Sequence, residues 1–361
     1  MLLKEFDYTL PAELIAQRPL AERDASRMLM LNRASQTFRD GAFREISQRL
    51  QPGDLLVFNN TKVFPARLLG RRRGITSQTI GKNNPALAEF LTGETELLLT
   101  RQESADVWQG LVRPGRKVRT GEVLVFGNDE LEAEILSRGE YGVRRVRLRV
   151  RHGTIEDAIE RLGHVPLPPY IVRDDEPSDH GTYQTVYAKV RGAVAAPTAG
   201  FHFTEQILHA LAARGVETCE VTLHVGLGTF QPVRVERVED HHMEAERYEV
   251  PEAASQAIDR ALDERRRVIA VGTTSVRTIE HVASQNGGRI PPGSGDTNLF
   301  IIPGFRFQVV GGMLTNFHLP QSTLLLLVSA FAGTEFVRRA YHHAVESRYR
   351  FYSYGDCMLI L

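Results

Sequence analysis

Hydrophobic and polar positions follow two different patterns along the chain, and the pattern changes near residue 152. Between residues 59 and 151, short apolar runs of strand length are separated by turns of Gly, Pro and Asn. The runs are ELLLT, WQGLVR, EVLVF, LEAEIL and VRRVRLRV. Short strands at this spacing predict a small all-β barrel or sandwich.

From residue 152 onward, helical and strand-like patterns alternate. Residues 154–163 and 204–215 predict helices that end at glycine, and Thr204 is a good N-cap. A strand (216–226), a helix (251–267), the buried strand VIAVG and the helix TSVRTIEHVASQ follow. This order predicts an α/β domain with a mixed, largely parallel sheet or barrel and covering helices.

The first 58 residues also mix helical and strand-like patterns. We therefore predict an α/β catalytic domain made of residues 1–58 plus 152–361. The basic β-barrel domain, residues 59–151, is expected to be inserted into it. A chain of 361 residues suits two such domains.

Composition narrows the class of protein. The most apolar run, TLLLLVSAFAG (323–333), is shorter than the ~20 residues of a membrane span, so we expect a buried helix. Cys219 and Cys357 form no disulfide framework, and the start of the chain lacks a secretion signal. DHH at 240–242 is a lone cluster without further metal ligands. We expect a cytoplasmic protein, a monomer, without a catalytic metal.

The net charge of zero hides a gradient along the sequence. Residues 60–151 contain 17 Lys plus Arg against 11 Asp plus Glu. The basic stretches are RLLGRRRG, RPGRKVRTG and RRVRLRVRHG. A solvated arginine face is the more common explanation, but confinement to one segment also favours contact with a nucleic-acid backbone.

Two loops of similar form precede predicted helices. GAVAAPTAGFHFTEQIL and LTNFHLPQSTL each place a histidine, His202 or His318, after a phenylalanine and before an apolar residue. One such histidine is usually a packed core residue. Two of them favour a pocket with aromatic walls and groups that exchange protons.

Three further stretches carry candidate chemistry. In VIAVGTTSVRTIEHV a strand runs through Gly-Thr-Thr-Ser into a helix with Arg277, which suits a carboxylate or phosphate, although a capped turn explains the hydroxyls equally well. HVGLGTFQPV lacks the third glycine of a dinucleotide or methyltransferase fingerprint, and leaves a turn beside His224. As a strand, HHMEAERYEV would put His242, Glu244, Glu246 and Tyr248 on one face, either solvated or lining a cleft.

Several long blocks of the chain closely resemble the S-adenosylmethionine:tRNA ribosyltransferase-isomerase family of queuosine biosynthesis. The likeness runs from FDYTLPAELIAQRPL to the last residues and is weakest between about 71 and 90. The blocks are GDLLVFNNTKVFPARLLG, YQTVYAKVRGAVAAPTAGFHFTEQIL, VTLHVGLGTFQPVR, RVIAVGTTSVRTIE, TNLFIIPGF, TNFHLPQSTLLLLVSAFAG and YRFYSYGDCM.

The resemblance implies that S-adenosylmethionine donates its ribosyl carbons rather than its methyl group. The acceptor would be 7-aminomethyl-7-deazaguanine at the wobble position of tRNA, and the product epoxyqueuosine, with adenine and methionine released. S-adenosylmethionine would be a cosubstrate, with no catalytic cofactor. The basic β unit would hold the anticodon arm through residues Lys62, Arg67, Arg71, Arg72 and Arg73.

The same resemblance implies roles for individual residues. The candidates for proton transfer are His202, His224, Glu246 and His318, and which is base and which is acid stays open. Phe201, Phe203, Phe317 and Glu246 would surround the sulfonium, and the methionine carboxylate would be anchored by Thr273, Thr274, Ser275 and Arg277. Glu244 stands where the family usually has a second histidine.

Two other classes of function compete with this interpretation. A conventional S-adenosylmethionine-dependent tRNA methyltransferase would use the same cosubstrate, but the glycine fingerprint at 226–228 is incomplete. A non-catalytic tRNA-binding protein would explain the basic segment and leave the polar loops of the α/β part unexplained.

Overall fold

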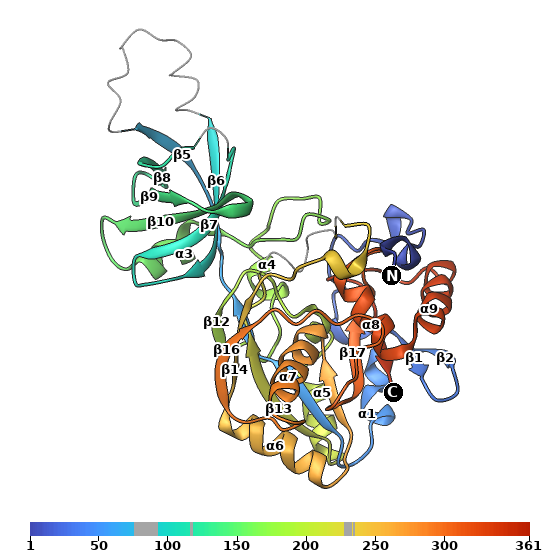
Figure 1. The fold of residues 1–361 in the computed structure, drawn as a ribbon. Helices are drawn as coiled ribbons and strands as arrows, with labels where there is room; N and C mark the ends of the chain where they lie inside the picture. Colours follow the sequence, from blue (N-terminus) through green and yellow to red (C-terminus); the bar gives the residue numbers. More distant parts are fainter. Residues whose placement is uncertain (76–92, 116–117, 227–232, 234) are drawn as a thin grey trace.

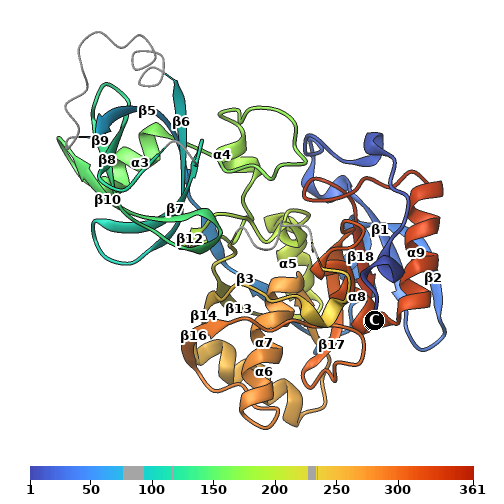
Figure 2. The same ribbon diagram turned by 45° about the horizontal axis from the view of Figure 1, so that its top comes forward.

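The structure, a computed structural model, describes residues 1–75, 93–115, 118–226, 233 and 235–361. A large sheet covered by helices carries a separate β-barrel at one side (Figure 1). The turned view in Figure 2 shows the same separation, with β3 leading from the sheet toward the barrel. The stretch TSQTIGKNNPAL (76–87) and residues 227–232 of HVGLGTFQPV lie outside the described residues.

The large sheet has nine strands in the described part of the chain. Their order is β16 (Gly293–Thr297), β14 (Glu246–Val250), β13 (Glu217–Leu223), β3 (Leu55–Asn59), β15 (Val268–Val271), β17 (Val310–Asn316), β18 (Cys357–Ile360), β1 (Arg27–Asn32) and β2 (Thr37–Ala42). Among these described strands, four neighbouring pairs are parallel and four are antiparallel. The sheet is mixed as predicted, but parallel pairing does not dominate, because β1, β14 and β17 each have an antiparallel neighbour.

Helices cover both faces of the sheet. Along β3, Leu55 and Val57 point into the larger core and Leu56 and Phe58 into the smaller one, as the two-residue period of a strand requires. The first face is covered by α6 (Glu252–Asp263), α7 (Thr273–Gln285), α8 (Thr323–Ala332) and α9 (Thr334–Glu346). The second is covered by α1 (Ile46–Arg49) and α5 (Glu205–Ala213).

Local signals account for most helix ends. The Thr204 hydroxyl accepts a hydrogen bond from the amide of Ile207 and so caps α5, as predicted. The apolar run 323–333 is the buried helix α8. Helix α6 ends at Asp263, before the predicted end, because Arg265 takes a positive φ of 56°.

No helix in the described residues is long and apolar enough to cross a membrane.

Six antiparallel strands close the barrel through pairing of β5 with β8. They are β5 (Arg67–Ile75), β6 (Glu94–Gln102), β7 (Val107–Arg113), β8 (Glu122–Phe126), β9 (Leu131–Arg138) and β10 (Val143–Val150). Each of the five apolar runs expected to be strands lies in one of β6–β10. The short strand β11 (Gly163–His164) extends the sheet beside β5.

Helix α3 (Ile155–Leu162) belongs to the barrel by its packing. Ala158 and Ile159 lie in the barrel's hydrophobic core. Gly163 follows because a Cβ there would come within 2.0 Å of the Pro65 carbonyl oxygen. The division at residues 151 and 152 stays a prediction, and these contacts favour an end of the barrel unit near residue 164.

Short elements connect the two units. Strands β4 (Thr61–Val63) and β12 (Val190–Ala193) pair in parallel between the barrel and the large sheet. A short helix, α4 (Asp179–Thr182), lies in the long connection before β12. The remaining turns include 3₁₀ helices at Leu3–Phe6, Ala12–Leu14, Arg23–Ala25, Phe43–Glu45, Glu140–Gly142, Thr198–Gly200 and Val238–Asp240.

Candidate active site

Two cavities lie on either side of residues 224–226, which follow β13. Val225 lines a small cavity of about 70 Å³ at the start of α7, here called the α7 pocket. His224 and Gly226 line a cavity of about 620 Å³ between the barrel and the sheet, here called the barrel groove. This short segment therefore separates two hollows of different size.

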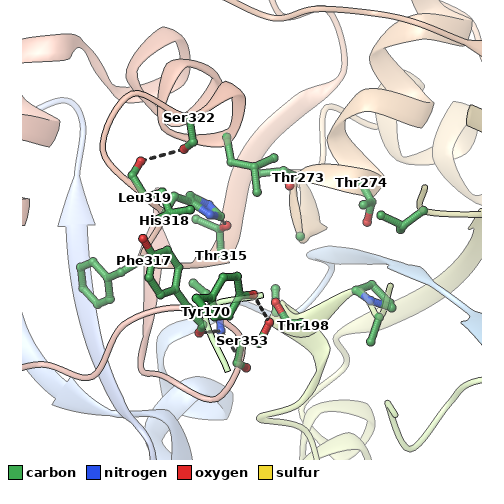
Figure 3. A pocket seen from close by; sticks show the side chains of 18 residues that line it. Tyr170, Thr198, Thr273, Thr274, Thr315, Phe317, His318, Leu319, Ser322 and Ser353 are labelled. Atoms are coloured by element: carbon green, nitrogen blue, oxygen red, sulfur yellow. Dashed lines mark hydrogen bonds between the residues drawn. The ribbon is translucent and has the colours of Figure 1, made fainter. Parts of the chain in front are cut away.

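Loops at the ends of β15 and β17 form the α7 pocket (Figure 3). Its lining in the described residues contains no Asp, Glu, Lys or Arg side chain. The side chains and glycine that line it are Tyr170, Ala196, Pro197, Thr198, Ala199, Val225, Gly272, Thr273, Thr274, Thr315, Asn316, Phe317, His318, Leu319, Ser322, Leu324, Tyr352 and Ser353. A cavity of this lining suits a ligand part that is held by hydroxyls, amides and aromatic rings.

The start of α7 gives the pocket its polar end. Gly272 turns the chain from β15 into the helix with a φ of 87°, a conformation that favours glycine. The first amides of a helix have no acceptor within the helix, and the helix dipole makes this end positive. The Thr274 hydroxyl is buried and has no hydrogen-bond partner among the described residues. Of the four residues predicted to anchor the carboxylate, Thr273 and Thr274 therefore line the α7 pocket.

Ser275 and Arg277 point elsewhere. The Ser275 hydroxyl donates to the carbonyl oxygen of Val271 at 2.8 Å, within its own helix start. Arg277 forms a buried ion pair with Glu246 and donates to the carbonyl oxygen of Leu299 at 3.1 Å. Neither residue lines the α7 pocket, so their predicted part in the carboxylate anchor stays a prediction.

Glu246 connects three parts of the site. It begins β14, pairs with Arg277 on α7, and accepts a hydrogen bond of 2.9 Å from the amide of Gly226. Its side chain is 5% exposed and lines the barrel groove. These bonds hold the segment between the cavities to α7. The strand predicted over HHMEAERYEV starts only at Glu246, where pairing with β16 begins, so His242 and Glu244 precede it.

His318 lines the α7 pocket and is buried. Its Nε2 lies 2.8 Å from the Thr315 hydroxyl, and its backbone amide donates to the Tyr341 hydroxyl at 3.0 Å. Burial lowers the pKa of His318 to about 3. The imidazole is therefore neutral at pH 7 and does not act there as a proton donor in the cationic form.

His202 does not line the α7 pocket but lines a separate cavity, together with Phe201. Its Nδ1 lies 2.8 Å from the Ser26 hydroxyl and its Nε2 3.1 Å from Asn316 Oδ1. Because the Asn316 amide nitrogen donates to the Tyr352 carbonyl oxygen, its Oδ1 faces His202, which assigns the ring proton to Nε2. Burial lowers the pKa of His202 to about 4. Both ring nitrogens are engaged, and the predicted catalytic role of His202 stays a prediction.

The predicted aromatic wall is only partly assembled. Phe317 lines the α7 pocket. Phe203 packs edge-on against Phe43 and Phe58 in the core, and Phe201 lines a different cavity. Their predicted contact with the sulfonium stays a prediction.

Two tyrosines that the sequence reasoning did not single out complete this wall. The rings of Tyr170 and Tyr352 stack with centroids 4.5 Å apart. Tyr352 has a φ of 71°, unusual for a residue other than glycine, and its buried hydroxyl has no partner among the described residues. For Tyr352 the signal available in the sequence was the aromatic-rich stretch YRFYSYG, in which nothing distinguishes one tyrosine from the next, and Tyr170 lies outside that stretch.

His224 faces the barrel groove. Its Nδ1 lies 2.9 Å from the Thr61 hydroxyl, and its backbone amide donates to the Arg247 carbonyl oxygen. The ring packs so closely on Gly192 that a Cβ there would lie 2.7 Å from it. Burial, and then the positive charge of Arg247, lower the pKa of His224 below its usual value. His224 is therefore an oriented, neutral imidazole at pH 7.

The arginines predicted to hold tRNA are paired with carboxylates across the barrel. Arg67 lies 3.1 Å from Glu96, Arg71 3.0 Å from Asp129, and Arg73 2.7 Å from Glu132. Arg72 is largely buried in an ion pair with Glu122. Lys62 is exposed on β4. Cross-strand partners thus neutralise much of the charge that the sequence concentrates here.

In the described residues, no group of three or more His, Cys, Asp or Glu side chains is arranged to hold a metal ion. Both cysteines are buried and form no disulfide. Among the described residues, the polar groups that line the two cavities are hydroxyls, imidazoles, backbone and side-chain amides, arginines and carboxylates.

A mixed sheet with a closed barrel, a small pocket at the start of α7 and a larger groove between sheet and barrel define a two-part α/β protein. The chain belongs to the queuosine biosynthesis protein family, whose model matches residues 3–360. It is 53% identical over 363 residues to S-adenosylmethionine:tRNA ribosyltransferase-isomerase of Solibacter usitatus, covering 100% of both chains. The protein of that name from Moorella thermoacetica is 49% identical over 361 residues, again covering 100% of both chains.

A solved structure is similar to the whole chain. It is the crystal structure of S-adenosylmethionine tRNA ribosyltransferase from Thermotoga maritima, which is 38% identical in sequence. The comparison covers 99% of this chain and 100% of that chain, with a TM-score of 0.53. The family resemblance predicted from the motifs is confirmed over its full length.

Proposed function

We propose that this chain transfers and isomerises the ribosyl moiety of S-adenosylmethionine onto 7-aminomethyl-7-deazaguanine at the tRNA wobble position. The product is epoxyqueuosine, and adenine and methionine leave. The observation that carries the proposal is the 53% identity, over the full length of both chains, to a protein named for this activity. Neither a methyltransferase nor a non-catalytic binding protein has comparable support.

The α7 pocket takes the methionine end of S-adenosylmethionine. The start of α7, with Thr273 and Thr274, suits the carboxylate, since free amides and the helix dipole favour an anion. Phe317, Tyr170 and Tyr352 offer aromatic faces to the sulfonium. The volume of about 70 Å³ is far below the roughly 300 Å³ of a typical complete ligand site. The adenosyl part must therefore extend past residues 224–226.

His224 is the better candidate for accepting a proton. The reaction requires proton removal next to the sulfonium and a neutral amine for attack. A base must be deprotonated at the working pH, and the lowered pKa of His224 satisfies this. Thr61 holds its Nδ1, so Nε2 is the nitrogen that faces a substrate. His318 contributes a neutral hydrogen-bonding group to the pocket, and His202 supports the loop around Asn316.

The proposed cosubstrate and tRNA are both cytoplasmic compounds, and two buried free cysteines suit a reducing compartment. We assign the protein to the cytoplasm on these grounds. The monomeric state expected from the sequence stays a prediction.

The decisive experiment is adenine release. Purified protein is incubated with S-adenosylmethionine and tRNA carrying 7-aminomethyl-7-deazaguanine, and the products are separated by chromatography. The same tRNA with guanine at the wobble position is the control. We expect adenine and methionine only with the modified tRNA. S-adenosylhomocysteine would instead identify a methyltransferase, and tRNA binding without turnover would identify a binding protein.

A further inference from the structure

The barrel groove is larger than the α7 pocket and, unlike that pocket, is lined by charged side chains. Its volume of about 620 Å³ lies within the range typical of sites for small molecules and nucleotides. One wall is the barrel, with residues 100–104 and Gln109, Leu111 and Val143. The other wall is the sheet side, with Arg191, Gly192, His224, Gly226 and residues 244–247. Both units of the molecule are needed to form it.

Three arginines line the groove. Two of their guanidinium groups make fewer or longer contacts with carboxylates than those of the arginines on the barrel strand β5. The side chain of Arg247 makes no ion pair within the described part of the chain. Arg101 is half exposed and lies 3.7 Å from Asp296, beyond hydrogen-bond distance. Arg191 bonds Glu160 through Nε, but its Nη2 is buried and has no partner among the described residues. Such guanidinium groups are suited to phosphate oxygens.

Other groups that line the groove differ in character from the arginines. His224 is one of them, oriented by Thr61. Glu244 also lines the groove and makes no ion pair within the described residues. Gln109 and Leu111 on β7 add an amide and an apolar surface. Amide, carboxylate and imidazole groups beside an apolar wall fit the polar edges and flat face of a nucleobase.

We propose that the barrel groove binds the extruded wobble nucleotide of an RNA anticodon loop, with Arg101, Arg191 and Arg247 on its phosphates and the base directed toward His224. This inference rests on the proposed function. A nucleotide that carries negative phosphates and a positive aminomethyl group matches a groove that is lined by three arginines and by Glu244. The base would then meet the adenosyl part of the cosubstrate at residues 224–226, where the two cavities adjoin.

The charge pattern of the sequence predicts phosphate contacts at another place, on Lys62, Arg67, Arg71, Arg72 and Arg73. Four of these five residues are arginines of the barrel strand β5. Those arginines already have carboxylate partners, so a phosphate would have to compete with each of them. The two locations therefore make different predictions for substitution.

The test measures tRNA binding directly. Arg101→Gln and Arg247→Gln are compared with Arg71→Gln at the rival location, and Arg214→Gln, exposed at the end of α5, is the control. Fluorescence anisotropy with modified tRNA gives Kd at several KCl concentrations, and thermal melting checks that each variant is folded. We expect each groove variant to raise Kd about fivefold and to lower the slope of log Kd against log salt by about 1. The control should bind like the wild type.

The outcomes separate this inference from the proposed function. A larger effect of Arg71→Gln than of either groove variant would overturn the groove as the RNA site, whatever the enzyme catalyses. Weaker binding by the groove variants, in a protein that binds tRNA but releases no adenine, would support the groove and overturn the proposed function. Adenine release by the wild type, with an unchanged Kd for tRNA in both groove variants, would support the proposed function and overturn the groove as the RNA site.

Discussion

At the scale of single residues, burial decides what each histidine can do. His202 and His318 are both enclosed, and their pKa values fall to about 4 and about 3. His224 is partly open to the barrel groove, and burial also lowers its pKa. The three histidines that were equal candidates for proton transfer in the sequence therefore differ in exposure. The catalytic proposal centres on His224 for this reason.

Replacing His224 tests its role as the base. We expect His224→Gln to lower kcat for adenine release by about 10²- to 10⁴-fold, the usual contribution of a positioned base, with Kd for tRNA little changed. The wild-type pH profile of kcat should fall on the acid side with a midpoint below about pH 6.5, the ordinary histidine pKa, because burial lowers the pKa of His224. Steady-state kinetics of both proteins give these values. A midpoint above about pH 6.5 would contradict the assignment, because it would belong to a group whose pKa is not lowered.

His202 makes stability depend on pH. Its pKa is about 4 in the folded protein and about 6.5 when unfolded, so below pH 6.5 the unfolded state binds more protons. The contribution is fully present above pH 6.5 and is lost as the pH falls toward 4. Between pH 7 and 5 we expect the free energy of unfolding to fall by about 2 kcal/mol through this residue. Urea titrations at both pH values should show a smaller fall in His202→Gln.

At the scale of elements, buried carboxylates join helices to strands. Glu280 on α7 is fully buried and accepts hydrogen bonds from the backbone amides of Gln308, Val309 and Val310, at 2.8 to 3.0 Å. These amides lie at the start of β17, whose other end leads into the α7 pocket. The carboxylate thus fixes helix and strand in one relative position. The helical spacing of the sequence indicated α7 but not this contact.

Substitution of Glu280 should therefore be costly. A glutamine retains one acceptor oxygen, and its amide nitrogen would face a backbone amide. We expect Glu280→Gln to lower the free energy of unfolding by about 2 to 3 kcal/mol, the cost of leaving a buried polar group unpaired. Urea denaturation measures this. Glu335→Gln, which removes an exposed ion pair with Arg338 on α9, should change stability by less than about 1 kcal/mol.

At the scale of the whole molecule, one buried ion pair fixes the segment that lies between the two cavities. Glu246 and Arg277 connect β14 to α7, and Glu246 also holds the amide of Gly226. The segment that separates the α7 pocket from the barrel groove therefore depends on a contact between distant parts of the chain. A disturbance here reaches both proposed substrate sites.

Glu246→Gln distinguishes a structural from a catalytic glutamate. Removing one charge of a buried pair leaves the other uncompensated, so we expect a loss of about 3 kcal/mol of unfolding free energy. Arg277→Met should lose a similar amount, since it breaks the same pair. Thermal melting and urea titration give the values. A glutamate needed only for catalysis would show unchanged stability in both variants, with a fall of kcat confined to Glu246→Gln.

Local patterns in the sequence were sufficient for several of the elements, although the helix predicted over 251–267 ends early and strands such as β17 and β18 were not predicted. Alternation over short runs predicted β6 to β10, and Thr204 predicted the start of α5, because both signals come from residues close together in the chain. The long motifs were also sufficient for the family. The Gly-Thr-Thr-Ser stretch predicted the start of α7, and the binding of an anion there stays a prediction.

Only the tertiary structure decided which of the candidate groups meet. Arg72 and Glu122 are 50 residues apart, and Tyr170 and Tyr352 are 182 apart, so no local pattern reports their contact. The fold of the barrel pairs the arginines of β5 with carboxylates. Two of the three arginines that line the barrel groove have fewer or more distant carboxylate partners among the described residues. Burial, which depends on the whole fold, set the pKa values of the histidines. Sequence determined the elements and the kind of chemistry, and the long-range contacts decided which residues are in a position to perform it.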